Sequence, residues 1–96
     1  MAATPEGKVK DQIKKLLRDK QIWFFMPVPG RISVHGVPDF ICCWNGRFLA
    51  IEAKAPGRRG NTTPNQDQRI KEIQRADGVA LVVDDVEQLK EVLENG

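Results

Sequence analysis

Two carboxylates and a lysine stand at the ends of two apolar segments. Asp39 precedes the apolar residues 40–44, and Glu52 and Lys54 end the segment 47–54. Charged groups in such places carry a large desolvation cost unless they are paired or bound to an ion. Mg²⁺ is typically held by one or two carboxylates and completes its shell with water and phosphate oxygens. These residues therefore predict a divalent-metal site that polarises a phosphoryl group and activates water.

A tight hairpin is expected to bring the three charged residues together. Asn45-Gly46 lies between the two apolar segments and is the dipeptide favoured in type I′ turns, because both residues tolerate positive φ. Strand alternation puts Glu52 and Lys54 on one face, and pairing across the turn places Asp39 near Glu52. Lys54 has two roles open to it: to deprotonate the attacking water, or to neutralise charge on the phosphorus.

Helical periodicity points two more polar residues toward the same place. Glu6 and Gln66 each lie in the first turn of a predicted helix, on the stripe that otherwise faces the core. Gln68 is rotated by about 200° from Gln66 at 3.6 residues per turn, so Gln66 is the favoured residue. The stripes consist of Val9 and Ile13 in the first helix and of Ile70 and Ile73 in the second.

The elements that must position these residues follow from local signals. Thr4-Pro5 and a threonine before Pro64 are helix starts, and alternating or continuous apolar runs predict strands. The order is α-β-β-β-α-β-α, which predicts one mixed sheet with helices on its faces. The expected elements are a helix over 5–19, strands over 21–26, 40–44 and 47–54, a helix over 64–76 ended by Gly78, a strand over 79–83, and a last helix capped by Asp84 or Asp85.

Length and composition predict a single folded domain over residues 1–96. Apolar residues make up 41% of the chain and charged residues 29%, and the formal net charge is +2. Basic residues, Lys10 among them, gather on the surface of the first helix, and acidic ones in the last segment. With no apolar run of roughly 18 residues and no signal-peptide core, we expect no membrane association and a cytoplasmic location. Cys42 and Cys43 are expected to be reduced packing residues.

Together, Gly36-Val37-Pro38-Asp39 and Glu52-Ala53-Lys54 resemble the PD-(D/E)XK nuclease pattern, and more specifically the VRR-NUC family. That family adds a glutamate in the first helix and a glutamine after the ExK strand, which Glu6 and Gln66 match. The resemblance spans about residues 4 to 85. It implies an α/β fold with a restriction-endonuclease-like αβββαβ core, a mixed central sheet flanked by helices, and an extra C-terminal helix.

What the resemblance implies for chemistry is a site that binds Mg²⁺ or Mn²⁺. Asp39, Glu52 and the backbone carbonyl of Ala53 would be metal ligands, with Glu6 as a further direct or water-mediated ligand. Lys54 and Gln66 would attend the attacking water and the scissile phosphate. Stand-alone members of this size resemble phage and bacterial homodimers, which implies a bacterial or phage-infected host cell.

The implied activity is that of a homodimeric endodeoxyribonuclease, selective for branched DNA such as Holliday-like junctions or flaps. A less selective exonuclease or nicking enzyme is one alternative, and a DNA-binding or protein-interaction module without turnover is another. The residues expected to contact DNA phosphates are Arg58 and Arg59 in the loop 55–61, Lys14 on the first helix, and Arg31 in the loop 30–38.

Overall fold

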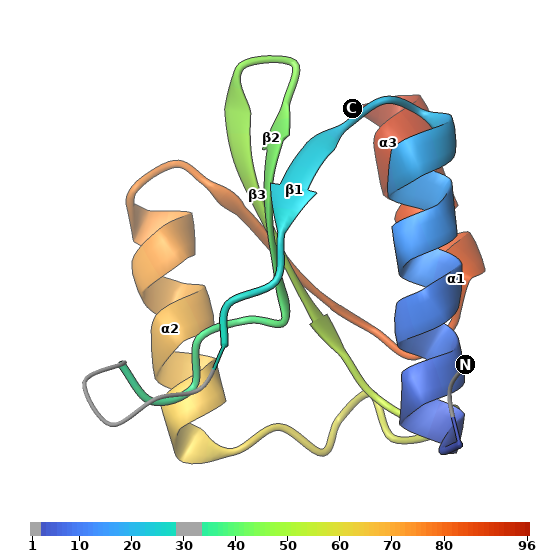
Figure 1. Ribbon diagram of the computed structural model, residues 1–96. Coiled ribbons are helices and arrows are strands. Elements are labelled where there is room, and N and C mark those ends of the chain that lie inside the picture. The colour runs from blue at the N-terminus through green and yellow to red at the C-terminus, as the bar shows by residue number, and fades with distance from the viewer. Residues whose placement is uncertain (1–2, 29–33) are drawn as a thin grey trace.

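The computed structural model describes residues 3–28 and 34–96, so the predicted DNA contact Arg31 lies outside the described residues. The described residues form three helices and four strands in the predicted order αβββαβα (Figure 1). The elements are α1 (Pro5–Asp19), β1 (Trp23–Phe25), β2 (Phe40–Trp44), β3 (Arg47–Ala53), α2 (Pro64–Arg75), β4 (Val79–Val83) and α3 (Val86–Asn95). None of the described helices combines the length and apolarity needed to cross a membrane.

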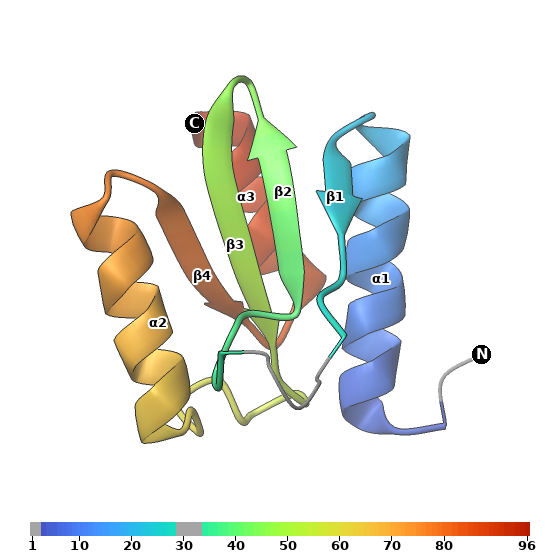
Figure 2. The ribbon, with the colours of Figure 1, turned by 60° about the vertical axis from the view of Figure 1, so that its left-hand side comes forward.

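The four strands form one mixed sheet in the order β1-β2-β3-β4 (Figure 2). β1, β2 and β3 are antiparallel neighbours, whereas β4 pairs with β3 in parallel. The β2–β3 turn has Asn45 at φ 50° and Gly46 at φ 76°, the positive values that the predicted hairpin requires. The predicted α/β class and mixed sheet are therefore confirmed.

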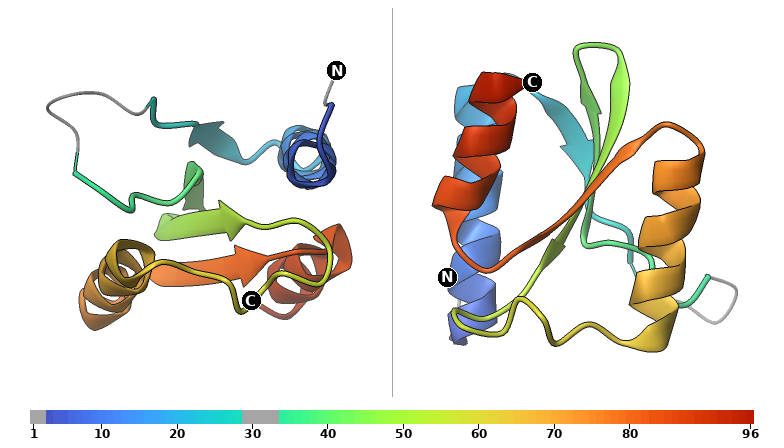
Figure 3. Two further views of the ribbon diagram at one scale, coloured as in Figure 1. Left: turned by 90° about the horizontal axis from the view of Figure 1, so that it is seen from below. Right: turned by 180° about the vertical axis from the view of Figure 1, so that it is seen from behind.

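Helices cover both faces of this sheet. α1 and α3 lie together against one face, and α2 packs against β4 on the other, which we call the α2 face (Figure 3). The face beneath α1 and α3 holds the core, where burial of each large apolar side chain contributes about 1.5–3 kcal/mol. The core residues are Val9, Ile13, Leu16, Leu17, Phe40, Cys42, Trp44, Leu49, Ile51, Ala53, Val83 and Leu89.

Two strands are shorter than predicted, and the strand expected over 47–54 ends at Ala53, one residue before Lys54. The first strand was expected over residues 21–26 but covers Trp23–Phe25, because Gln21 takes φ 56° and the chain is still leaving α1 there. The second helix runs from Pro64 to Arg75 with Ala76 as its C-cap, within one residue of the expected 64–76, but Asp77 rather than Gly78 has positive φ (66°). Gly78 is required for space instead, since a Cβ there would come within 2.7 Å of the Ile73 side chain.

Candidate functional site

Four element ends lie at the end of the sheet where β3 and β4 finish, the lower edge in Figures 1 and 2, with the two helix ends on opposite sides of it. They are the start of β2, the end of β3 and the N-terminal ends of α1 and α2. Helix N-termini carry a partial positive charge and unpaired N–H groups, which favour nearby anions. This edge is therefore electrostatically suited to carboxylates and to a phosphate.

Asp39 lies at this edge, just before β2. Phe40 pairs with Ile51, so the preceding position of β2 falls beside Glu52, as the hairpin predicted. The Oδ2 atom of Asp39 accepts a hydrogen bond from the backbone N–H of Ala53 at 2.8 Å. The end of β3 thus fixes the orientation of this carboxylate. That contact uses the Ala53 N–H, and the role of its carbonyl as a metal ligand stays a prediction.

The Glu52 carboxylate is buried, with only 4% of the residue exposed. Burial and then the adjacent Asp39 carboxylate raise the pKa of Glu52 to about 8, with a smaller contribution from Glu6 and an opposing one from the Lys54 ammonium. Two carboxylates in such proximity disfavour each other's ionisation. The site therefore favours either a bound proton or a bound cation.

Gln66 connects α2 to the charged end of β3. Its Nε2 donates to Glu52 Oε2 at 3.1 Å, and its Oε1 accepts from Lys54 Nζ at 3.0 Å. The Lys54 and Glu52 side chains are 3.9 Å apart at Nζ and Oε2 and are both largely buried. Gln66 Oε1 also accepts from the Thr63 backbone N–H, which completes a capping box at the start of α2. One amide thus supports both the helix end and the charged cluster.

The two glutamines of α2 point in different directions, as helical periodicity predicted. Gln66 turns toward the sheet, whereas Gln68 Nε2 donates to Glu72 Oε2 on the exposed side of the helix. The predicted orientation is therefore confirmed, while the part that Gln66 takes in chemistry stays a prediction.

Gly36 sets the distance between the loop that leads to Asp39 and the start of α2. It has φ +81°, and a Cβ built on it would lie 2.6 Å from the Gln66 backbone nitrogen and closer still to Asn65. No side chain fits there without moving the backbone. Gly36 therefore permits the close approach that puts Gln66 and Asp39 in one site, a reason that sequence reasoning did not find.

Lys10 also belongs to the site, although the sequence pattern predicts only a surface lysine of the first helix at this position. Its Nζ lies 3.4 Å from Glu6 Oε2 and 3.5 Å from Asp39 Oδ1. Burial lowers the pKa of Lys10, but the Asp39 and Glu6 carboxylates outweigh burial and raise that pKa above its ordinary 10.5. The four-residue spacing from Glu6 was a usable signal for the helical pair. The contact with Asp39 depends on the tertiary fold.

The structure gives the predicted DNA-contacting residues other neighbours. Lys14 Nζ lies 3.9 Å from Asp11 Oδ1 on the same helix. The Nε of Arg59 donates to the Val82 carbonyl at 2.8 Å, which ties the loop after β3 to β4. Arg58 precedes it and is exposed. DNA contact by these residues stays a prediction.

The acidic residues offer hard oxygen donors of the kind that Mg²⁺ and Mn²⁺ take. Within residues 3–28 and 34–96, no three His, Cys, Asp or Glu side chains are arranged as a ready metal site. In this arrangement the Lys10 ammonium lies between Glu6 and Asp39. The donor set still fits a divalent ion, because such an ion would relieve the repulsion between Asp39 and Glu52 that the pKa of Glu52 reflects.

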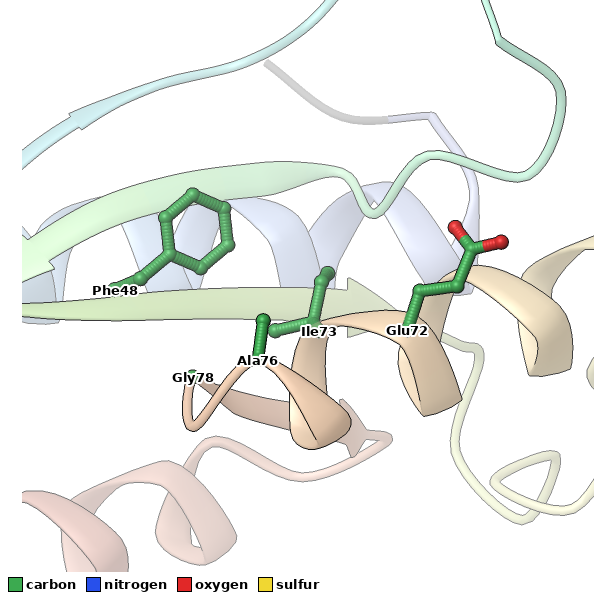
Figure 4. Close-up of a pocket in the computed structure, with 5 residues that line it drawn as sticks. All are labelled: Phe48, Glu72, Ile73, Ala76 and Gly78. Atoms are coloured by element: carbon green, nitrogen blue, oxygen red, sulfur yellow. The ribbon is translucent and has the colours of Figure 1, made fainter.

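Away from the charged edge, the α2 face is apolar and open. The strand register places Trp23, Cys43 and Phe48 in one row across β1, β2 and β3, and all three are exposed. Phe48 then borders a pocket of about 380 Å³ between the sheet and α2 (Figure 4). The other residues that line this pocket are Glu72, Ile73, Ala76 and Gly78. The pocket is hydrophobic and distinct from the cluster around Glu52.

Comparison with known proteins gives no family assignment. No protein-family model matches the sequence, and no curated protein matches it either. Function is therefore inferred from the chemistry of the site.

Proposed function

We propose that this protein is a divalent-metal-dependent endodeoxyribonuclease that hydrolyses DNA phosphodiester bonds. The observation that carries the proposal is the buried Glu52 carboxylate, which lies beside Asp39 and is hydrogen-bonded to Gln66. Placing a carboxylate in a buried position beside a second one costs stability unless a cation joins them. Titratable groups kept at such a cost are typical of functional sites.

The residues proposed to hold Mg²⁺ or Mn²⁺ are Asp39, Glu52 and the Ala53 carbonyl, with Glu6 as a further ligand. When bound, the metal supplies a Lewis acid for a phosphoryl oxygen and a water of lowered pKa. The chain itself contributes the orientation of the ligands. The Ala53 N–H holds Asp39, and the Gln66 amide holds Glu52.

Lys54 is proposed to stabilise the negative charge that develops on the phosphate. Its Nζ donates to Gln66 Oε1 and lies 3.9 Å from Glu52 Oε2, so a positive charge stands beside the carboxylates. Such preorganised charge in a site shielded from water is worth more than the same charge in solution. Of the two roles open to Lys54, this contact with Glu52 favours electrostatic stabilisation over deprotonation of water.

We also propose that the elements from α1 to β4 form a restriction-endonuclease-like core of the VRR-NUC type, to which α3 is added. The αβββαβ order, the mixed sheet and the position of Glu52 at the end of β3 support this assignment. The proposed substrates are branched or flapped DNAs. Arg58 and Arg59 in the loop after β3, together with Lys14 and Arg31, are the proposed phosphate contacts.

The proposed oligomeric state is a homodimer that associates through the α2 face. Trp23 is 64% exposed, Phe25 46% and Phe48 47%, which are large values for aromatic residues on one sheet face. Exposed apolar rows of this kind are typical of interaction surfaces. A two-fold dimer would also carry two symmetric sites, which can cut the two strands of a branched DNA.

A panel of labelled DNAs tests the activity and its mode. Wild-type protein is incubated with a four-way junction, a flap, a duplex and a single strand, in Mg²⁺, Mn²⁺ or EDTA. The proposal predicts internal cuts in the junction or flap with either metal and none in EDTA. Stepwise shortening from an end would identify an exonuclease, and single cuts in the duplex a nicking enzyme. Binding without cutting of any substrate would favour the non-catalytic module.

A further inference from the structure

The Lys10 ammonium shares its partners with the proposed metal site. Its Nζ lies 3.4 Å from Glu6 Oε2 and 3.5 Å from Asp39 Oδ1, and 29% of its side chain is exposed. The other Asp39 oxygen is held by the Ala53 backbone N–H. Each oxygen of Asp39 therefore has a donor, one fixed in the backbone and one at the end of a flexible side chain.

The pairing of Lys10 differs from that of its neighbours on α1. Lys14 and Lys15 pair with acidic residues of the same helix, and Lys15 Nζ lies 2.8 Å from Asp19 Oδ2 with both side chains exposed. Lys10 also pairs within the helix, with Glu6, but its second contact crosses from α1 to the start of β2. Lys10 therefore neutralises two carboxylates from separate parts of the chain, Glu6 and Asp39, as a bound metal ion would.

We propose that Lys10 is a positioning residue that stands in for the metal: it neutralises Glu6 and Asp39 in the metal-free protein and leaves them when a divalent ion binds. This inference rests on the proposed metal site. An ammonium and a divalent ion a few ångströms apart repel strongly in a partly buried setting. The flexible lysine stem allows Nζ to move away without a change in the backbone. Lys10 thus competes with the metal and weakens its binding.

Mn²⁺ binding tests the competition without reference to activity. The dissociation constant is measured by electron paramagnetic resonance of free Mn²⁺ for wild type, Lys10→Gln, Lys10→Arg and Lys15→Gln. Loss of two partly exposed ion pairs predicts about fivefold tighter binding by Lys10→Gln. Lys10→Arg keeps the competing charge, and Lys15→Gln removes a charge from the same helix outside the cluster. Both controls are expected to bind Mn²⁺ as wild type does.

The outcomes separate this inference from the function on which it rests. If wild type binds Mn²⁺ and Lys10→Gln binds it equally well or more weakly, the inference about Lys10 is overturned. The proposed metal site would not be affected by that result. Absence of Mn²⁺ binding by wild type would overturn both.

A measurement on the wild-type protein covers the case in which Lys10→Gln does not fold. Trace acetylation of lysine amines, read by mass spectrometry, reports how accessible each Nζ is. Saturating Mn²⁺ is expected to increase acetylation of Lys10 severalfold and to leave that of Lys15 unchanged. Unchanged or reduced acetylation of Lys10 would show that the ammonium stays with its carboxylates, which would overturn the inference.

Discussion

Gln66 Nε2 donates to Glu52 Oε2 across 3.1 Å, so an amide in the first turn of α2 orients the buried carboxylate of β3. The carbonyl oxygen of the same amide accepts from Lys54 Nζ and from the Thr63 backbone N–H. Removal of this side chain would leave only the 3.9 Å contact between the buried Glu52 and Lys54 side chains, and would remove one of the two hydrogen bonds of the α2 capping box. Stability and chemistry therefore depend on the same residue.

We expect Gln66→Ala to lower the free energy of unfolding by about 2–4 kcal/mol, because the hydrogen bonds to Glu52 and Lys54 and one bond of the α2 capping box are lost together. Gln68→Ala is the matched control, since Gln68 pairs with Glu72 on the exposed side of α2. That change should stay within about 0.5 kcal/mol of wild type. Urea unfolding in EDTA measures both variants. Equal losses in the two would contradict the linking role of Gln66.

The metal-free protein is expected to lose stability as the pH rises. The pKa of Glu52 is raised from 4.5 to about 8, so between these values the folded state holds a proton that the unfolded state has released. The stabilisation is complete below about pH 4.5 and is lost as the pH rises through about 8, with a slope of up to about 1.4 kcal/mol per pH unit.

Unfolding curves of wild type and Glu52→Gln in EDTA, from about pH 5 to about pH 8, measure this slope. The substitution removes the titrating group and should flatten the profile. A wild-type profile that is already flat, or one that Glu52→Gln leaves unchanged, would show that Glu52 is ionised in the folded state at neutral pH.

Gly36→Ala is expected to destabilise the protein and to slow cleavage, because the new methyl group would meet the backbone of Asn65 and Gln66. Gly46→Ala is the control, since Gly46 also has positive φ but a Cβ there meets nothing within 4 Å. The excess cost of Gly36→Ala over Gly46→Ala should be about 1–3 kcal/mol, the range for overpacking. Equal losses of stability in the two variants would mean that a glycine is needed at position 36 for its positive φ and not for its contact with Asn65 and Gln66.

The two adjacent cysteines should differ in reactivity toward a thiol reagent. Cys42 is 2% exposed, and burial raises the pKa of its thiol to about 12, so it should react only after unfolding. Cys43 is exposed in the row between Trp23 and Phe48. It should react in dilute protein and become protected as the protein concentration rises.

Trp23→Ser should abolish that protection if the α2 face joins two copies. Val28→Ser is the control, because Val28 is exposed but lies outside the sheet. A Cys43 reaction rate that does not change with protein concentration would contradict the proposed dimer surface.

Local signals were sufficient to predict most of the fold. α1 begins at Pro5 and ends at Asp19, β4 covers Val79–Val83, and the hairpin turns at Asn45-Gly46, as expected. Caps, turn dipeptides and apolar periodicity act over a few residues and can be read directly. The length of β1 could not be predicted in this way. It depends on how the chain leaves α1 and on which residues of β2 it then pairs with.

The site could be predicted where the regular geometry of a helix or hairpin alone determines where a side chain points. The orientation of Gln66 rather than Gln68 followed from the helical repeat, and the proximity of Asp39 and Glu52 followed from the hairpin.

The roles of Gly36 and Lys10 were missed for a common physical reason. Each role is defined by a neighbour that lies far away in the sequence, which is Asn65 for the glycine and Asp39 for the lysine. Neither neighbour belongs to the same helix, turn or hairpin as the residue that it contacts. Such distant contacts arise only once the chain has folded, so local patterns in the sequence cannot indicate them.

The most direct test of the proposed metal site is the cleavage rate of Asp39→Ala on a DNA that wild type cuts. The rate is measured at saturating Mn²⁺ beside that of Asp19→Ala, which removes an exposed carboxylate at the far end of α1. Loss of a ligand to the catalytic metal predicts a rate at least about 100-fold lower for Asp39→Ala, and a wild-type rate for Asp19→Ala. Cleavage by folded Asp39→Ala at the wild-type rate would contradict the proposed metal site.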